Sequence, residues 1–103
     1  MKIKEITAVL EGYAPLSLQE SYDNAGLIIG DPDSEVSGAL ITLDVTKEVI
    51  EEAISLGFQM IISHHPVVFQ GMKRFTGANF TEKVVIKAIR NNTAMSFCFI
   101  PAP

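Results

Sequence analysis

The dipeptide His64-His65 is the part of the sequence best suited to chemistry, because imidazole nitrogens bind divalent metal ions. It follows the apolar run 58–63 and precedes Pro66. Consecutive residues of a regular strand point to opposite faces, so one ion cannot take both rings while the strand continues. Pro66 lacks a backbone donor and favours an extended His65, which lets the chain leave the sheet. Each ring could then bind its own ion in a two-metal site, with zinc, iron, manganese or cobalt.

Asp44 is a second candidate ligand, since it follows the apolar run 38–43. His64 and His65 are the only histidines of the chain, and a zinc site needs about three or four protein ligands. Two plainer interpretations stay open. The histidine pair could cap a strand through hydrogen bonds, and Asp44 could serve a turn or a helix cap. From the residues alone, the chain does not complete a metal site, and no catalytic residue is assigned.

Two weaker candidates lie elsewhere in the chain. Asp23 and Asn24 could face a ligand from a loop, although an Asx-type turn that leads into the next strand is the favoured interpretation. Cys98 is the only cysteine and lies in an apolar run, so we expect a buried thiol and no internal disulfide.

The elements expected to position Asp44 and the histidines form a strand, a helix and a strand over residues 38–63. Thr46 is the expected N-cap of the helix and Gly57 its left-handed C-cap. We expect its buried stripe to comprise Val49, Ile50, Ala53 and Ile54, with Leu56 as a further candidate. Such a unit places its two strands parallel. Ligands of parallel sheets bind beyond the carboxyl ends of the strands, where Asp44 and His64-His65 fall.

The remaining pattern predicts an α/β fold, with a mixed or parallel βαβ-containing sheet flanked by helices, and places residues 1–103 in a single partial domain. An amphipathic helix is expected from Ile3 to the region of Gly12–Pro15, and strands are expected over 26–30 and 94–100. Thr81 is the expected cap of a helix that continues to Asn91. The side chains expected to point inward from that helix are Val84, Val85, Ala88 and Ile89.

Composition narrows the partners and the compartment. The 103 residues carry a formal net charge of −4, and their Lys and Arg residues are scattered without a basic stripe, which argues against a nucleic-acid partner. No apolar run reaches the roughly 20 residues of a membrane helix. The N-terminus does not read as a signal peptide, so a cytoplasmic location is expected. Lys73-Arg74 is interpreted as a solvated turn, with an anion contact as the alternative.

Four segments together resemble the Nif-three-like dinuclear metal-centre family, whose members are often labelled GTP cyclohydrolase I type 2 homologues. They are Tyr22–Gly30 (Tyr-Asp-Asn-Ala-Gly-Leu-Ile-Ile-Gly), Leu43–Thr46, Ile62–Pro66 (Ile-Ser-His-His-Pro) and Lys73–Phe75, and the match runs in order from Met1 to about Ala94. The resemblance implies the N-terminal part of a larger α/β fold with a mixed sheet. It further implies a toroidal homohexamer with two divalent metal ions per intact subunit, held partly by the pair that His64 and His65 match. The label implies hydrolytic opening of the guanine ring of GTP by a metal-activated water.

The sequence departs from the family pattern near its end. Residues 99–103 stand where the family has a strand leading into His-Thr-Asn-Leu-Asp, so the aspartate ligand would fall near Pro103, which has no coordinating side chain. The family's C-terminal His and Glu ligands have no counterpart. We therefore expect a fragment or frameshifted product that binds metal weakly and has little activity.

Three functions are compatible with these observations. The leading hypothesis is a truncated member of a metal-dependent hydrolase family with a nucleotide substrate. The second is a non-enzymatic regulatory or interaction module in which the remnant of the metal site is structural. The third is a metal-dependent phosphoesterase in which Lys73-Arg74 contacts phosphate.

Overall fold

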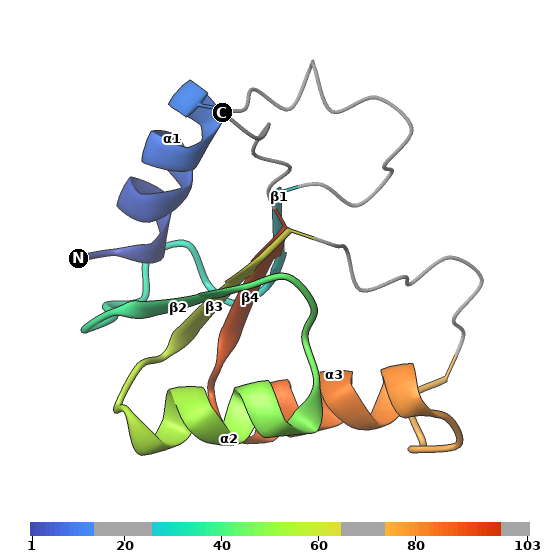
Figure 1. Cartoon of the computed structure of the whole chain (residues 1–103). Coiled ribbons are helices and arrows are strands. Elements are labelled where there is room, and N and C mark those ends of the chain that lie inside the picture. Colours follow the sequence, from blue (N-terminus) through green and yellow to red (C-terminus); the bar gives the residue numbers. More distant parts are fainter. Residues whose placement is uncertain (14–25, 65–73, 98–103) are drawn as a thin grey trace.

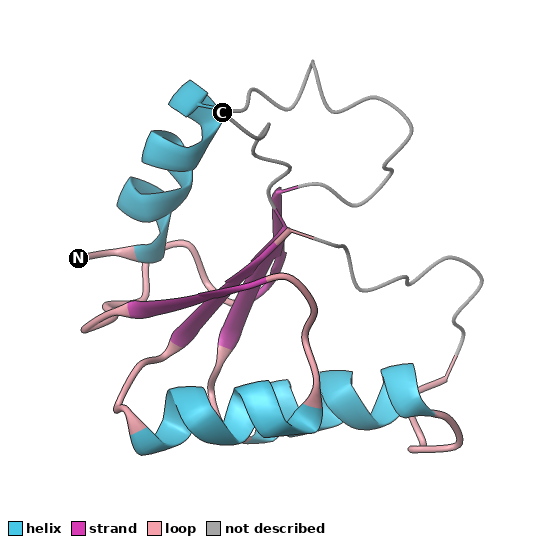
Figure 2. Cartoon of the chain, viewed as in Figure 1, coloured by secondary structure: helices cyan, strands magenta, loops and turns pink. Residues whose placement is uncertain are grey.

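A four-stranded mixed sheet separates one helix on one face from two helices on the other (Figure 1). The computed structural model describes residues 1–13, 26–64 and 74–97. Figure 2 shows the same layers coloured by element type. No helix in these ranges is long and apolar enough to cross a membrane. The elements are α1 (Ile3–Tyr13), β1 (Gly26–Ile29), β2 (Ala39–Thr42), α2 (Lys47–Ser55), β3 (Met60–Ser63), α3 (Phe80–Arg90) and β4 (Ala94–Phe97).

The strand order is β1-β4-β3-β2. β2, β3 and β4 are parallel, and their connections through α2 and α3 confirm the expected βαβ arrangement. β1 pairs with β4 in the antiparallel direction, with Gly26 opposite Phe97, so the sheet is mixed. The α/β fold class is therefore confirmed, and the choice that the sequence left open between a mixed and a parallel sheet is resolved as mixed.

The sheet buries apolar side chains on both faces. Toward α1 it contributes Met60, Ile62 and Ala94, which pack with Ile3 and Val36. Toward α2 and α3 the cluster consists of Val45, Ile50, Ala53, Ile61, Val84, Ala88 and Met95. The first three residues of β3, Met60, Ile61 and Ile62, alternate between the two clusters, and all four residues of the strand are buried. This two-sided burial explains why the strand that leads to His64 reads as an unbroken apolar run.

Local sequence signals predicted both ends of α2 correctly but the wrong N-cap for α3. Thr46 caps α2, because its hydroxyl accepts a hydrogen bond of 3.2 Å from the backbone N–H of Val49. Gly57 has the expected left-handed conformation, with φ 74°. The prediction that Thr81 caps α3 was wrong. The cap is Asn79, whose Oδ1 accepts a 2.9 Å hydrogen bond from the backbone N–H of Glu82.

Two isoleucines expected to point inward are exposed. Ile54 of α2 is 43% exposed and Ile89 of α3 is 56% exposed. Each directly follows a fully buried alanine, Ala53 or Ala88. One helical residue turns the side chain by about 100°, which carries both isoleucines beyond the narrow stripe that meets the sheet. Leu56, the further candidate for the stripe, is the C-cap of α2 and is 51% exposed.

Strand β2 forms one edge of the sheet within the described part of the chain. Two apolar side chains stand out from it and from the residue after it: Ile41 is 71% exposed and Leu43 is 65% exposed. Ile41 lies opposite Ile62 in the register of β2 and β3, and Ile62 belongs to the cluster under α1. The cover that α1 gives to this face therefore does not extend to the outer edge.

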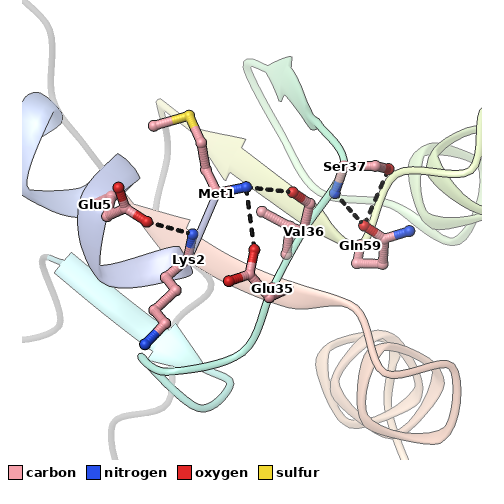
Figure 3. A network of polar contacts seen from close by, with 7 residues as sticks. All are labelled: Met1, Lys2, Glu5, Glu35, Val36, Ser37 and Gln59. Carbon is pink, nitrogen blue, oxygen red and sulfur yellow. Dashed lines mark hydrogen bonds and ion pairs between the residues drawn. The ribbon is translucent and has the colours of Figure 1, made fainter.

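Polar contacts join the N-terminus to the segment that leads into β2 (Figure 3). The ammonium group of Met1 donates to the carbonyl oxygen of Val36 at 3.2 Å and lies 3.3 Å from a carboxylate oxygen of Glu35. The Ser37 backbone N–H donates to Gln59 Oε1 at 2.7 Å. These contacts hold the start of α1 and the approaches to β2 and β3 together, at the end of the sheet where β2 and β3 begin.

Candidate metal-binding edge of the sheet

The ends of β2 and β3 lie side by side and bring Asp44 and His64 to one edge. Thr42 and Ser63 are the last residues of the two strands and are partners in the parallel register. The backbone N–H of His64 continues this pairing by donating to the carbonyl oxygen of Thr42 at 3.0 Å. Asp44 follows Thr42 by two residues. The expected position of Asp44 and His64 beyond the carboxyl ends of adjacent parallel strands is therefore confirmed.

Burial changes abruptly along this edge. Ser63 is 4% exposed and belongs to the interior, whereas His64 is half-buried and Asp44 is exposed. A side chain that receives an ion from solvent must be at least partly accessible, and both His64 and Asp44 meet that condition. The histidine that follows β3 is thus held by a buried strand on one side and reaches solvent on the other.

The backbone around Asp44 is anchored on both sides. The Thr42 hydroxyl donates to the carbonyl oxygen of Asp44 at 3.0 Å. Val45, the next residue, is 7% exposed and packs in the cluster beneath α2 and α3. Thr46 then caps α2. Asp44 consequently holds a defined place on a short connection and is not the N-cap of α2, which was one of the plainer interpretations open to it.

The donor types at this edge fit a transition-metal site, but their number does not complete one. An imidazole and a carboxylate suit zinc, iron and manganese. Within residues 1–13, 26–64 and 74–97, no three His, Cys, Asp or Glu side chains gather closely enough to hold an ion. His65 lies outside the described residues, so its expected role as the second imidazole stays a prediction. Further donors would have to come from outside these ranges.

Most of the other candidate residues lie outside the described part of the chain. Asp23, Asn24, Lys73 and Cys98 lie outside the described residues, and their expected roles stay predictions. Arg74 is described and exposed. The anion contact proposed for the Lys73-Arg74 pair is therefore untested.

Glu82 is an organising residue that the sequence analysis missed. Although it is only 9% exposed, its Oε1 accepts hydrogen bonds from the backbone N–H groups of Thr76 (3.0 Å) and Ala78 (3.3 Å). Its Oε2 accepts from the Asn79 side-chain amide at 3.0 Å. The Thr76 hydrogen bond lowers the pKa of Glu82 more than any other contact, while burial opposes the shift. The spacing Asn79-x-x-Glu82 resembles that of a capping box and is the sequence signal that could have pointed to it, although Glu82 accepts from the backbone of Ala78 and from the Asn79 side chain.

Comparison with known proteins gives a family-level match over almost the whole chain. Residues 1–97 match the model of the Duf34/NIF3 (NGG1p interacting factor 3) family. A Clostridium acetobutylicum protein named "GTP cyclohydrolase 1 type 2 homolog" is 40% identical over 92 residues, which are 89% of this chain and 34% of that protein. A Staphylococcus aureus protein of the same name is 51% identical over 72 residues, which are 70% of this chain and 20% of that protein.

A solved structure shares the fold. The crystal structure of Staphylococcus aureus protein SA1388 superposes with a TM-score of 0.86 at 42% sequence identity, covering 94% of this chain and 28% of that one. The chain therefore spans between about a fifth and a third of the length of these relatives.

Proposed function

The chain belongs to the Duf34/NIF3 family, as its motifs suggested, and from this premise we propose that it forms part of a metal-dependent hydrolase with a dinuclear metal centre. The proposed substrate is a nucleotide, in line with the name "GTP cyclohydrolase 1 type 2 homolog" carried by relatives at 40% and 51% identity. Because the chain spans only part of those relatives, the activity is proposed for the whole protein.

One observation supports the proposal above the others. His64, part of a motif shared with the family, directly follows β3 and lies beside the end of β2, where ligands of parallel sheets bind. Its backbone is fixed by the hydrogen bond to Thr42, and buried Ser63 precedes it. The backbone from which the imidazole side chain extends is therefore held by β3, whose four residues are all buried. A preorganised ligand of this kind loses little conformational entropy when an ion binds.

In the proposed centre, His64 and His65 supply imidazole nitrogens to two divalent ions per intact subunit, with zinc, iron or manganese as candidates. Divalent metals at such centres polarise substrate oxygens and lower the pKa of water. The chain's own contribution is to hold His64 at a partly accessible edge. The exposed carboxylate of Asp44 adds negative charge to the same edge, which favours the approach of cations.

The whole protein would supply what the described residues do not. We propose that the missing metal ligands come from the part of the protein that the relatives possess beyond this match, and that the active form is a homohexamer in the cytoplasm. On its own, the chain is expected to bind metal weakly and to show little turnover.

Metal analysis of the longer protein tests the proposal. After dialysis against metal-free buffer, His64→Ala should lower the affinity for at least one of two ions by about tenfold or more, because a ligand is lost. Glu11→Gln, which changes an exposed residue of α1, is the matched control and should keep both ions. Unchanged metal content in His64→Ala would refute a role of this histidine in the centre.

Product analysis separates the candidate reactions. Formate released from GTP in the presence of metal would support ring opening, whereas phosphate released without formate would identify a phosphoesterase. The second candidate function, a non-enzymatic interaction module, is favoured by one observation: no three potential ligands gather within the described ranges. It predicts that the longer protein releases neither product, with or without His64.

A further inference from the structure

The outer face of α3 gathers basic side chains that are scattered in the sequence. Lys83, Lys87 and Arg90 are separated by four and three residues, so they lie along one face of the helix. Together they are three of the eight Lys and Arg residues of the chain. They line a hollow of about 720 Å³, whose other lining residues are Thr76, Gly77, Ile86 and Asn91.

The hollow is positive although the chain as a whole is negative. None of its lining residues is acidic, whereas the formal net charge of the chain is −4. Lys87 is partly neutralised, because its ammonium lies 2.6 Å from a carboxylate oxygen of Glu51 on α2. Lys83 and Arg90 are exposed, and neither forms an ion pair with another described residue. Lys83 and Arg90, which form no ion pair with another described residue, thus lie on either side of Lys87 along the hollow.

The size and ends of the hollow favour a short anion over a long chain. Arg90 lies seven positions after Lys83 in the helix, which corresponds to a rise of about 10 Å. At one end the hollow is bounded by Thr76 and Gly77, which precede α3, and at the other by Asn91, the C-cap. Its volume is that of a site for a small molecule. An extended acidic protein segment would have to continue past both ends.

We propose that this hollow binds the phosphate chain of an oligophosphate, either free or carried by a nucleoside. The Arg90 guanidinium can bind phosphate oxygens in a bidentate manner, and the lysine ammonium groups act as point charges beside it. The proposal does not depend on the metal centre proposed above, because none of its residues lies at the edge formed by Asp44 and His64. It can therefore hold or fail separately.

The test is a calorimetric titration of the chain with sodium tripolyphosphate at low salt, with EDTA present to exclude metal-mediated binding. The double variant Lys83→Gln/Arg90→Gln should bind at least about tenfold more weakly, since charge-assisted hydrogen bonds are lost. The matched control Lys2→Gln/Lys47→Gln removes the same charge from α2 and the start of the chain and should bind nearly as wild type. A single Arg90→Lys change should give an intermediate loss, because the charge stays and the bidentate contact is lost.

Titrations with nucleotides and with an acidic peptide complete the experiment. Similar affinities for tripolyphosphate, ATP and GTP would identify the phosphate chain as the recognised group, whereas a marked preference for one nucleotide would assign the binding energy to the base and overturn the proposal. Binding of a poly-glutamate peptide without binding of tripolyphosphate would overturn it in favour of an acidic protein partner. Equal losses in both double variants would also overturn it, since they would reflect overall charge alone. Circular dichroism checks that every variant is folded.

Discussion

Replacing Gly30 by alanine should be one of the most damaging small changes in this protein. Gly30 follows β1 and has φ +127°, a conformation that L-residues with a side chain rarely adopt. An added Cβ would lie 2.8 Å from the Cβ of Ala94, a distance that real Cβ atoms essentially never show, and the Ala94 Cβ cannot rotate away because it is bonded directly to the backbone. Ala94 begins β4, and the clash would therefore push β1 away from its antiparallel partner.

The expected cost is the sum of two terms. Holding an L-residue at such a φ costs about 1–3 kcal/mol, and forcing an extra methyl group into a packed contact costs about 1–3 kcal/mol. A total of about 2–6 kcal/mol is a large share of the roughly 5–15 kcal/mol that stabilises a typical domain. For a chain of this length, it corresponds to a fall in melting temperature of at least about 8 °C.

Urea denaturation followed by circular dichroism measures the cost directly. Gly12→Ala is the control, because Gly12 lies in α1 and no atom of the described residues is within 4 Å of its added Cβ; alanine should stabilise that helix by about 0.5–1 kcal/mol. Adding Ala94→Gly to Gly30→Ala should recover the steric part alone in a double-mutant cycle. A Gly30→Ala variant within about 0.5 kcal/mol of wild type would refute both parts of the reasoning.

Two further predictions concern the caps of the helices that cover the sheet. Glu82→Gln should lower the melting temperature near neutral pH. Because the pKa of Glu82 is lowered in the folded state, the stabilisation by its carboxylate is complete above the unfolded pKa of 4.5 and is lost as the pH falls through the lower folded pKa. The melting temperatures of wild type and Glu82→Gln should therefore converge in acid. A difference in melting temperature that widens in acid would contradict this assignment. Thr46→Ala should cost about 1 kcal/mol in urea denaturation because the backbone N–H of Val49 loses its acceptor. Thr46→Ser keeps the hydroxyl and should retain most of the stability, so equal losses in the two variants would argue against the cap.

The local signals of the sequence were sufficient where one residue decides the conformation. Gly57 and Thr46 mark the ends of α2 because a left-handed backbone and an N-cap hydroxyl depend on the residue itself. At α3, Asn79 and Thr81 are both good N-cap residues, and the choice between them depends on Glu82. The spacing Asn79-x-x-Glu82 favours Asn79 already in the sequence, whereas the hydrogen bonds that Glu82 accepts from the backbone at Thr76 and Ala78 depend on the folded turn.

Features that depend on residues far apart in the chain were harder to predict from the sequence. The antiparallel pairing of β1 with β4 joins Gly26 to Phe97, and nothing in either segment specifies its partner or direction. Exposure at the margins of a helix has the same origin, since Ile54 and Ile89 are apolar but lie just outside the contact with the sheet. The topology did place His64 and Asp44 correctly, because the ends of parallel strands converge whatever their side chains are. The metal they are proposed to bind remains a prediction.

The position of β2 at an edge of the sheet, within the described part of the chain, has a practical consequence when the chain is purified by itself. Edge strands of native sheets commonly carry lysine, proline or a bulge, which hinder pairing with a strand of another molecule. Strand β2 (Ala39-Leu-Ile-Thr42) has neither lysine nor proline, and its pairing with β3 shows no shift in register. Stored samples should accordingly self-associate as concentration rises, by strand addition between molecules. Ile41→Lys would be expected to delay the onset of light scattering while leaving the melting temperature almost unchanged, because that side chain is already largely in water.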